Sequence, residues 1–172
     1  MINLKQTLIL CVMLSSITAV KAQKGLAINT NSYQNAIGLR AGPTSGLTFK
    51  HFMGNNAVEG ILGFWHSGFS LTGLYEVHAN AGLPGLNWYY GGGGHVAVQP
   101  SSYYYKQYRN DYYYRYRDQG VAIGIDGIVG LEYKIKPIPF AISLDIKPLI
   151  EINNHGGVFT GLDPGLGIKL TF

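Results

Sequence analysis

The chain has 172 residues, enough for one domain, and only 13% of them are charged, against roughly 25% in ordinary soluble proteins. Glycine, with 24 residues, and aromatic residues, at 13%, are abundant, which favours β-structure with little charged surface over a helical enzyme. The formal net charge of +4 falls to about +2 without Lys5 and Lys21, which lie in a segment expected to be removed. This charge is too weak to predict nucleic-acid binding.

Residues 1–22 have the pattern of a secretory signal peptide. Lys5 supplies a positive start, an apolar run too short to span a membrane follows, and Ala22 ends a stretch suited to cleavage. Cleavage would leave residues 23–172 as the exported domain. It would also remove Cys11, the only cysteine of the chain, so we expect no disulfide, thiol chemistry or thiolate metal site.

The exported part contains segments in which apolar and small or polar residues alternate, which indicates β-strands. Several have a length near the roughly 9–11 residues that a tilted membrane strand needs. The expected strands cover about Gln34–Gly42, Gly46–Met53, Ala57–His66, Phe69–Ala81, Leu86–Gln99, Val121–Lys136, Phe140–Asn153 and Leu162–Phe172.

The two faces of these strands differ in an unusual way. Between Val121 and Ile135 one face is aliphatic or aromatic, whereas the other carries glycine, alanine and an occasional charge. Such a polar face is a poor solvated surface but suits the interior of a narrow barrel, with the aliphatic face toward lipid. We therefore expect an all-β fold, an eight-stranded antiparallel transmembrane β-barrel whose closure leaves no free edge. A secreted soluble β-protein remains the alternative.

If each strand turns its small and polar face inward, a set of charged side chains points into the barrel. Buried charges must pair and form hydrogen bonds, because each costs several kcal/mol otherwise. We interpret the set as a packed polar core, since eight strands leave an interior just wide enough for side chains. A gated ion pore is the alternative. The set is Arg40, Lys50, Glu59, Glu76, Asp126, Glu132, Lys134, Asp145, Lys147 and Lys169.

The longest connection, at about residues 99–120, is expected to be an extracellular loop. Its stretch SSYYYKQYRNDYYYRYRDQG contains most of the tyrosines of the chain, interleaved with cations. It could form an interfacial girdle that contacts lipopolysaccharide, a binding surface for an extracellular protein or glycan, or a loop without a partner. The candidate contact residues are Tyr103, Tyr104, Tyr105, Tyr108, Arg109, Tyr112, Tyr113, Tyr114, Arg115, Tyr116 and Arg117.

With its signal peptide, its eight segments and its last residues Gly-Ile-Lys-Leu-Thr-Phe, the chain resembles the small eight-stranded outer-membrane β-barrel proteins of Gram-negative bacteria, the OmpX/OmpA-barrel, porin-like type. In that family an aromatic C-terminus with alternating apolar residues is the signal for the barrel-assembly machinery, and Ile168, Leu170 and Phe172 match it. The resemblance implies outer-membrane insertion by that machinery, lipid and lipopolysaccharide as surroundings, and no cofactor. It implies no single activity, because the fold hosts several.

We therefore expect a non-enzymatic structural or surface-interaction protein. A narrow pore for small solutes and a lipid A-modifying enzyme are the alternatives. The lipid A deacylases of this fold carry a His-x-Ser-Asn type motif, whereas His155 is followed by two glycines, and His66-Ser67 is expected at a hairpin tip. The histidines are scattered along the chain, so no metal site is expected. The glycine run 91–94 precedes no helix, which argues against phosphate binding.

Overall fold

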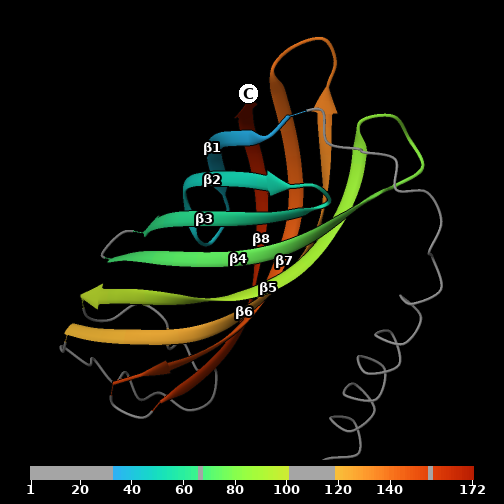
Figure 1. Ribbon diagram of the computed structural model, residues 1–172. Coiled ribbons are helices and arrows are strands. Elements are labelled where there is room, and N and C mark those ends of the chain that lie inside the picture. The colour runs from blue at the N-terminus through green and yellow to red at the C-terminus, as the bar shows by residue number, and fades with distance from the viewer. Residues whose placement is uncertain (1–32, 66–67, 101–118, 155–156) are drawn as a thin grey trace, which may run out of the picture.

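The computed structural model describes residues 33–65, 68–100, 119–154 and 157–172, and shows eight antiparallel strands that pair in chain order into a closed barrel (Figure 1). The expected all-β, eight-stranded antiparallel barrel is confirmed. The strands are β1 (Asn35–Ala41), β2 (Ser45–Met53), β3 (Asn56–Trp65), β4 (Gly68–Asn80), β5 (Leu86–Pro100), β6 (Gln119–Ile135), β7 (Phe140–Asn153) and β8 (Val158–Thr171).

The strand boundaries follow the sequence closely, with β8 as the main difference. The expected bounds of β7 agree with the structure, whereas β8 begins at Val158 rather than at Leu162. Phe159 on the inner face and Thr160 on the outer face interrupt the alternation there, which hid the first residues of the strand. The glycine run 91–94 lies within β5, as the sequence predicted.

Pairing between the first and last strands closes the barrel. Ile37 faces Leu170 and Leu39 faces Ile168 across the β1–β8 ladder. The backbone N–H of Asn35 donates to the carbonyl of Phe172 at 2.8 Å, and the N–H of Phe172 donates back at 2.9 Å. Because the ladder runs round the whole sheet, both edges that an open sheet would expose are paired along the shared length of β1 and β8.

The connections after β2, β4 and β6 lie at one end of the barrel and are all short, whereas the opposite end carries the longest connection, after β5, together with short ones after β1 and β3. We call the end that carries the links after β2, β4 and β6 the turn end, and the other the loop end. At the turn end, Gly54 and Gly85 adopt positive φ angles of 70° and 85°, a conformation that L-residues with a side chain avoid. These glycines allow β2 and β4 to reverse within a few residues.

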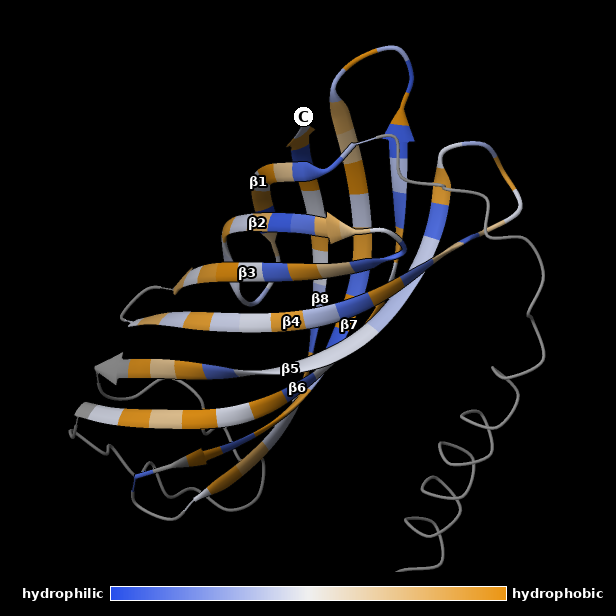
Figure 2. Cartoon of the chain, viewed as in Figure 1, coloured by the Kyte–Doolittle hydropathy of each residue, from blue (hydrophilic) through white to orange (hydrophobic). Residues whose placement is uncertain are grey.

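The outer face of the barrel is apolar and the inner face is polar. Figure 2 shows the corresponding alternation of hydrophilic and hydrophobic residues along the strands. On β8, Leu166, Ile168 and Leu170 point outward, whereas Asp163 and Lys169 of the same strand are buried inside. Period-two alternation places successive side chains on opposite sides of the sheet, so the same pattern repeats on every strand. The hydrophobic surface thus lies outside and the charged residues lie in the core.

Glycines on the inner face make room for large side chains from neighbouring strands. Tyr89 is fully buried and lies across from Gly130 in the β5–β6 ladder. A Cβ atom at Gly130 would lie 2.6 Å from Cζ of Tyr89, closer than non-bonded carbons come. At Gly73, by contrast, no atom lies within 4 Å of an added Cβ, because this position faces outward.

Replacing Gly130 by alanine is therefore expected to lower the free energy of unfolding by about 1–3 kcal/mol, because the added methyl group displaces Tyr89. The matched control is Gly73→Ala, which should change stability by less than about 1 kcal/mol. Urea unfolding of the refolded protein, followed by tryptophan fluorescence, measures both variants. Equal losses in the two would contradict this description of the core.

Candidate functional site

The charged side chains expected inside the barrel are buried there, with one exception. Lys134 lies at the turn end, where its ammonium donates to the carbonyls of Ile135 (3.1 Å) and Ile138 (2.7 Å) rather than to a carboxylate. The remaining members are each exposed by 5% or less: Arg40, Lys50, Glu59, Glu76, Asp126, Glu132, Asp145, Lys147 and Lys169.

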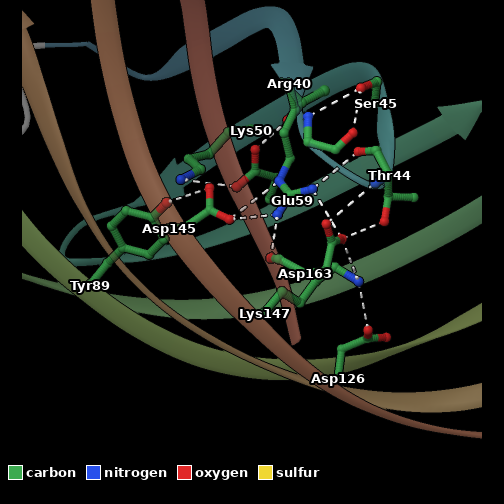
Figure 3. Close-up of polar contacts among 12 residues, drawn as sticks. Arg40, Thr44, Ser45, Lys50, Glu59, Tyr89, Asp126, Asp145, Lys147 and Asp163 are labelled. Atoms are coloured by element: carbon green, nitrogen blue, oxygen red, sulfur yellow. Dashed lines mark hydrogen bonds and ion pairs between the residues drawn. The ribbon is translucent and has the colours of Figure 1, made fainter. Parts of the chain in front are cut away.

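Arg40 is the centre of a group of ions toward the loop end. Its guanidinium contacts Asp145 of β7 at 2.7 Å and Asp163 of β8 at 3.1 Å (Figure 3). It also donates to the backbone carbonyls of Thr44 (3.1 Å) and Asp163 (3.0 Å). The hydroxyl of Thr44 donates to the carboxylate of Asp163 as well. A single cation on β1 therefore connects β7, β8 and the β1–β2 turn.

The same group continues through Lys147 and His95. Lys147 contacts Asp126 at 2.8 Å and Asp163 at 3.5 Å. His95 contacts Asp126 through Nδ1 at 2.7 Å and Glu151 through Nε2 at 3.1 Å. We call this set the Arg40 cluster; its members are Arg40, His95, Asp126, Asp145, Lys147, Glu151 and Asp163.

A second group surrounds Lys50 toward the turn end. The ammonium of Lys50, which is fully buried, contacts Glu76 at 2.7 Å, Glu59 at 3.0 Å and Glu132 at 3.3 Å. Lys169 contacts Glu59 at 3.0 Å and Glu132 at 3.3 Å. Lys50 thus contacts three carboxylates from three different strands, and Lys169 contacts two of them. We call these five residues the Lys50 cluster.

Tyr89 joins the two clusters. Its hydroxyl donates to Asp145 of the Arg40 cluster at 3.3 Å. The Nζ atom of Lys50 lies 4.4 Å from the centre of its ring, within range of a cation–π contact. The ring of His78 stacks on the same tyrosine at 4.8 Å, and its Nε2 lies 2.9 Å from Glu76. Polar and aromatic contacts therefore run along the interior without interruption between the clusters.

Tyr33, which precedes β1, lies at the turn end of the interior. Its hydroxyl donates to Glu132, and its ring contacts Phe52 edge-on with centroids 5.0 Å apart. Burial, and then the negative charge of Glu132, raises the pKa of Tyr33. The tyrosine therefore remains a hydrogen-bond donor to the Lys50 cluster.

Sequence reasoning left out several members of this interior. Asp163 lies on the inner face that the alternation of β8 predicted, but it was not included among the lumenal charges. His78, Tyr89 and His95 were left out as well. For His78 a signal was available, because it lies two residues from Glu76 on the same strand. For Tyr89 and His95 only the pairing of β5 with β6 shows that they share the inner face with Glu132 and Asp126.

Other residues singled out from the sequence lie either on the outer face of the barrel or in parts of the chain that the structure does not describe. Ile168, Leu170 and Phe172, which match the assembly signal, point outward. His51 shares the outer face, where its Nδ1 lies 2.8 Å from Oδ1 of Asn35. The tyrosine- and arginine-rich contact residues between 103 and 117 lie outside the described residues, as do His66 and His155.

In the part of the chain that the structure describes, three or more His, Asp or Glu side chains nowhere take an arrangement that could hold a metal ion. The same ranges contain no helix that is long and apolar enough to cross a bilayer.

Replacing Lys50 by methionine is expected to destabilise the barrel by about 3–5 kcal/mol, because it leaves buried carboxylates without their cation. Adding Glu76→Gln to this variant should recover part of the loss, since one of the orphaned charges is removed. Urea unfolding of the single and double variants tests this coupling. Losses that simply add would show that Lys50 and Glu76 act independently.

Comparison with protein-family models, with curated proteins and with solved structures gave no match. The number, antiparallel order and closure of the strands are compatible with an OmpX-like fold.

Proposed function

We propose that the chain is an integral β-barrel protein of the outer membrane of a Gram-negative bacterium, without catalytic activity, that presents a surface loop on a rigid barrel. The observation that carries the proposal is the reversed polarity of the barrel, with ion pairs inside and aliphatic side chains outside. The export signal expected in residues 1–22 supports the same location.

The outer face supports lipid as the surrounding medium. Large apolar side chains are exposed on every strand, among them Leu39 on β1, Leu71 on β4, Ile125 on β6 and Leu144 on β7. Soluble monomers rarely expose contiguous apolar patches larger than a few hundred Å². An apolar surface that surrounds the barrel is expected where hydrocarbon, and not water, is the solvent.

Aromatic side chains near the turn end support a membrane boundary there. Trp88 and Tyr90 point outward from β5 with their rings stacked at 5.4 Å, and Tyr133 lies on the neighbouring β6. Tyrosine and tryptophan favour the membrane–water interface, where the ring is apolar and the polar group is wet. We place this boundary on the periplasmic side, because bacterial barrels carry their long loops on the extracellular side and the longest connection, after β5, lies at the opposite end.

The filled interior favours a barrel without a conducting channel over a pore. The Arg40 cluster and the Lys50 cluster occupy successive levels of the interior, and Tyr89 fills the space between them. Eight strands leave room only for such side chains. A conducting path would need several buried ion pairs to open together.

The histidines also support a non-enzymatic role. His95 lies between two carboxylates, and His78 lies between Tyr89 and Glu76. Among residues 33–65, 68–100, 119–154 and 157–172, no hydrogen bond joins a histidine to a serine hydroxyl, as a serine hydrolase requires.

The proposed activity of the protein is the interaction of its tyrosine- and arginine-rich loop with lipopolysaccharide or with an extracellular partner.

Cell fractionation followed by gel electrophoresis tests this proposal. We expect the protein in the outer-membrane fraction, and a change in mobility between unboiled and boiled samples in detergent, because the closed barrel resists cold detergent. A soluble protein with the same mobility in both samples would contradict the proposal.

The closed interior is tested separately in planar lipid bilayers. Because ion pairs fill the barrel at two levels, the purified protein should give no single-channel conductance above background. Reproducible conductance steps at neutral pH would instead favour the pore.

A further inference from the structure

The wall of the barrel is much shorter on one side than on the other. β1 has 7 residues and β2 has 9, whereas β6 has 17 and β7 has 14 (Figure 1). A membrane-spanning strand tilted by about 45° needs roughly 9–11 residues. One side is therefore at or below the minimum and the other exceeds it.

The difference lies at the loop end, because the strands are aligned at the turn end. There the N–H of Asn35 donates to the carbonyl of Phe172, Thr171 to that of Pro139, and Phe52 to that of Gln34. At the loop end, β1 stops at Ala41 opposite Leu166, whereas β8 continues from there back to Val158. β1 and β2 together form what we call the short wall.

The apolar band on the outside varies in the same way. On β1 it comprises Ile37, Leu39 and Ala41, which at about 2.3 Å of height per tilted residue span about 9 Å. Below it lies the outward polar pair of Asn35 and His51. On β7 the apolar band runs from Phe140 to Ile152, or about 28 Å. Only the second value matches the apolar height of about 25 Å that outer-membrane barrels present.

A bilayer of uniform thickness would leave polar groups of the short wall in hydrocarbon. Ser45, at the loop end of β2, would lie about 18 Å from the level of Met53, which is about 7 Å below the far edge of a 25 Å layer. Ser45 and Gly42 exchange hydrogen bonds at 2.7 and 3.1 Å in an exposed turn. Exposed turns of this kind do not occur in contact with lipid hydrocarbon.

We propose that the short wall is a lipid-contact surface at which the bilayer is locally thinned, while the opposite wall contacts a layer of full thickness. The occupant is the acyl chains of the surrounding lipid, because the outward residues next to the polar pair are apolar and uncharged: Ile37, Leu39, Leu47 and Phe49. A strand shorter than the hydrocarbon layer is accommodated by thinning at a modest cost per ångström. This inference rests on the proposed membrane location.

The first test compares Ser45→Cys with Asn154→Cys in the Cys11→Ser background, each folded into dioleoylphosphatidylcholine vesicles. Asn154 is the reference because it is exposed beyond the apolar band of β7. A membrane-impermeant maleimide should modify both at rates within about threefold, since thinning brings Ser45 to the surface. Protection of Ser45→Cys by tenfold or more would overturn the inference.

The second test compares the stability of the folded barrel in dilauroyl and dioleoyl vesicles. The variant Asn35→Leu with His51→Leu lengthens the apolar band of the short wall. When the dilauroyl bilayer is replaced by the thicker dioleoyl bilayer, the unfolding constant of this variant should therefore rise about tenfold less than that of the unmodified protein. The matched control, Thr160→Leu, adds the same side chain to the outer face of the tall side and should leave the loss unchanged. An equal loss in all three proteins would overturn the inference.

The outcomes separate this inference from the proposed function. Failure of the unmodified protein to insert into any vesicle would reject the membrane location itself. Insertion with a protected Ser45→Cys would reject only the thinning. Efficient disulfide cross-linking of Leu39→Cys between copies in vesicles would assign the short wall to a second copy of the chain, and would also overturn the inference.

Discussion

Pairing of buried charges across strands that are distant in sequence is the constraint on which the rest of the structure depends. Arg40 on β1 reaches Asp145 and Asp163 near the end of the chain, and Lys50 on β2 reaches Glu132 on β6. An ion left unpaired inside the closed barrel would cost several kcal/mol. Closure of the barrel therefore depends on these pairs, and removal of a single ion affects several strands.

The charged interior also decides what the outside must be. Because period-two alternation gives each strand one face of each kind, ions inside leave the isoleucine, leucine, valine and phenylalanine side chains outside. The closed ladder from β1 to β8 pairs backbone groups round the barrel, a requirement that hydrocarbon imposes and water does not. Interior ion pairs, closure and an apolar exterior thus support the same proposed location, and the unequal wall heights refine how the barrel meets the bilayer.

The sequence predicted the strands well because alternation is a local signal. Residues 140–147 alternate without interruption, and the bounds of β7 were correct, whereas Phe159 and Thr160 concealed the start of β8. The partners of each charge were not predictable, because they depend on register around the whole barrel. His95 looked isolated in the chain, yet pairing places it between Asp126 and Glu151. Lys134 has the inward phase but lies at the rim, where carbonyl groups satisfy it.

The claim that the aliphatic face contacts lipid is tested most directly by spin labels on two adjacent residues of β7. In the Cys11→Ser background, Leu144→Cys places a nitroxide on the exposed outer face, and Ser143→Cys places one in the buried interior. In native membranes, the label at residue 144 should relax rapidly with oxygen, which concentrates in hydrocarbon, and slowly with a water-soluble nickel complex. The label at residue 143 should respond weakly to both. Rapid relaxation of the residue 144 label by the nickel complex would show that water covers this face, and would contradict the account.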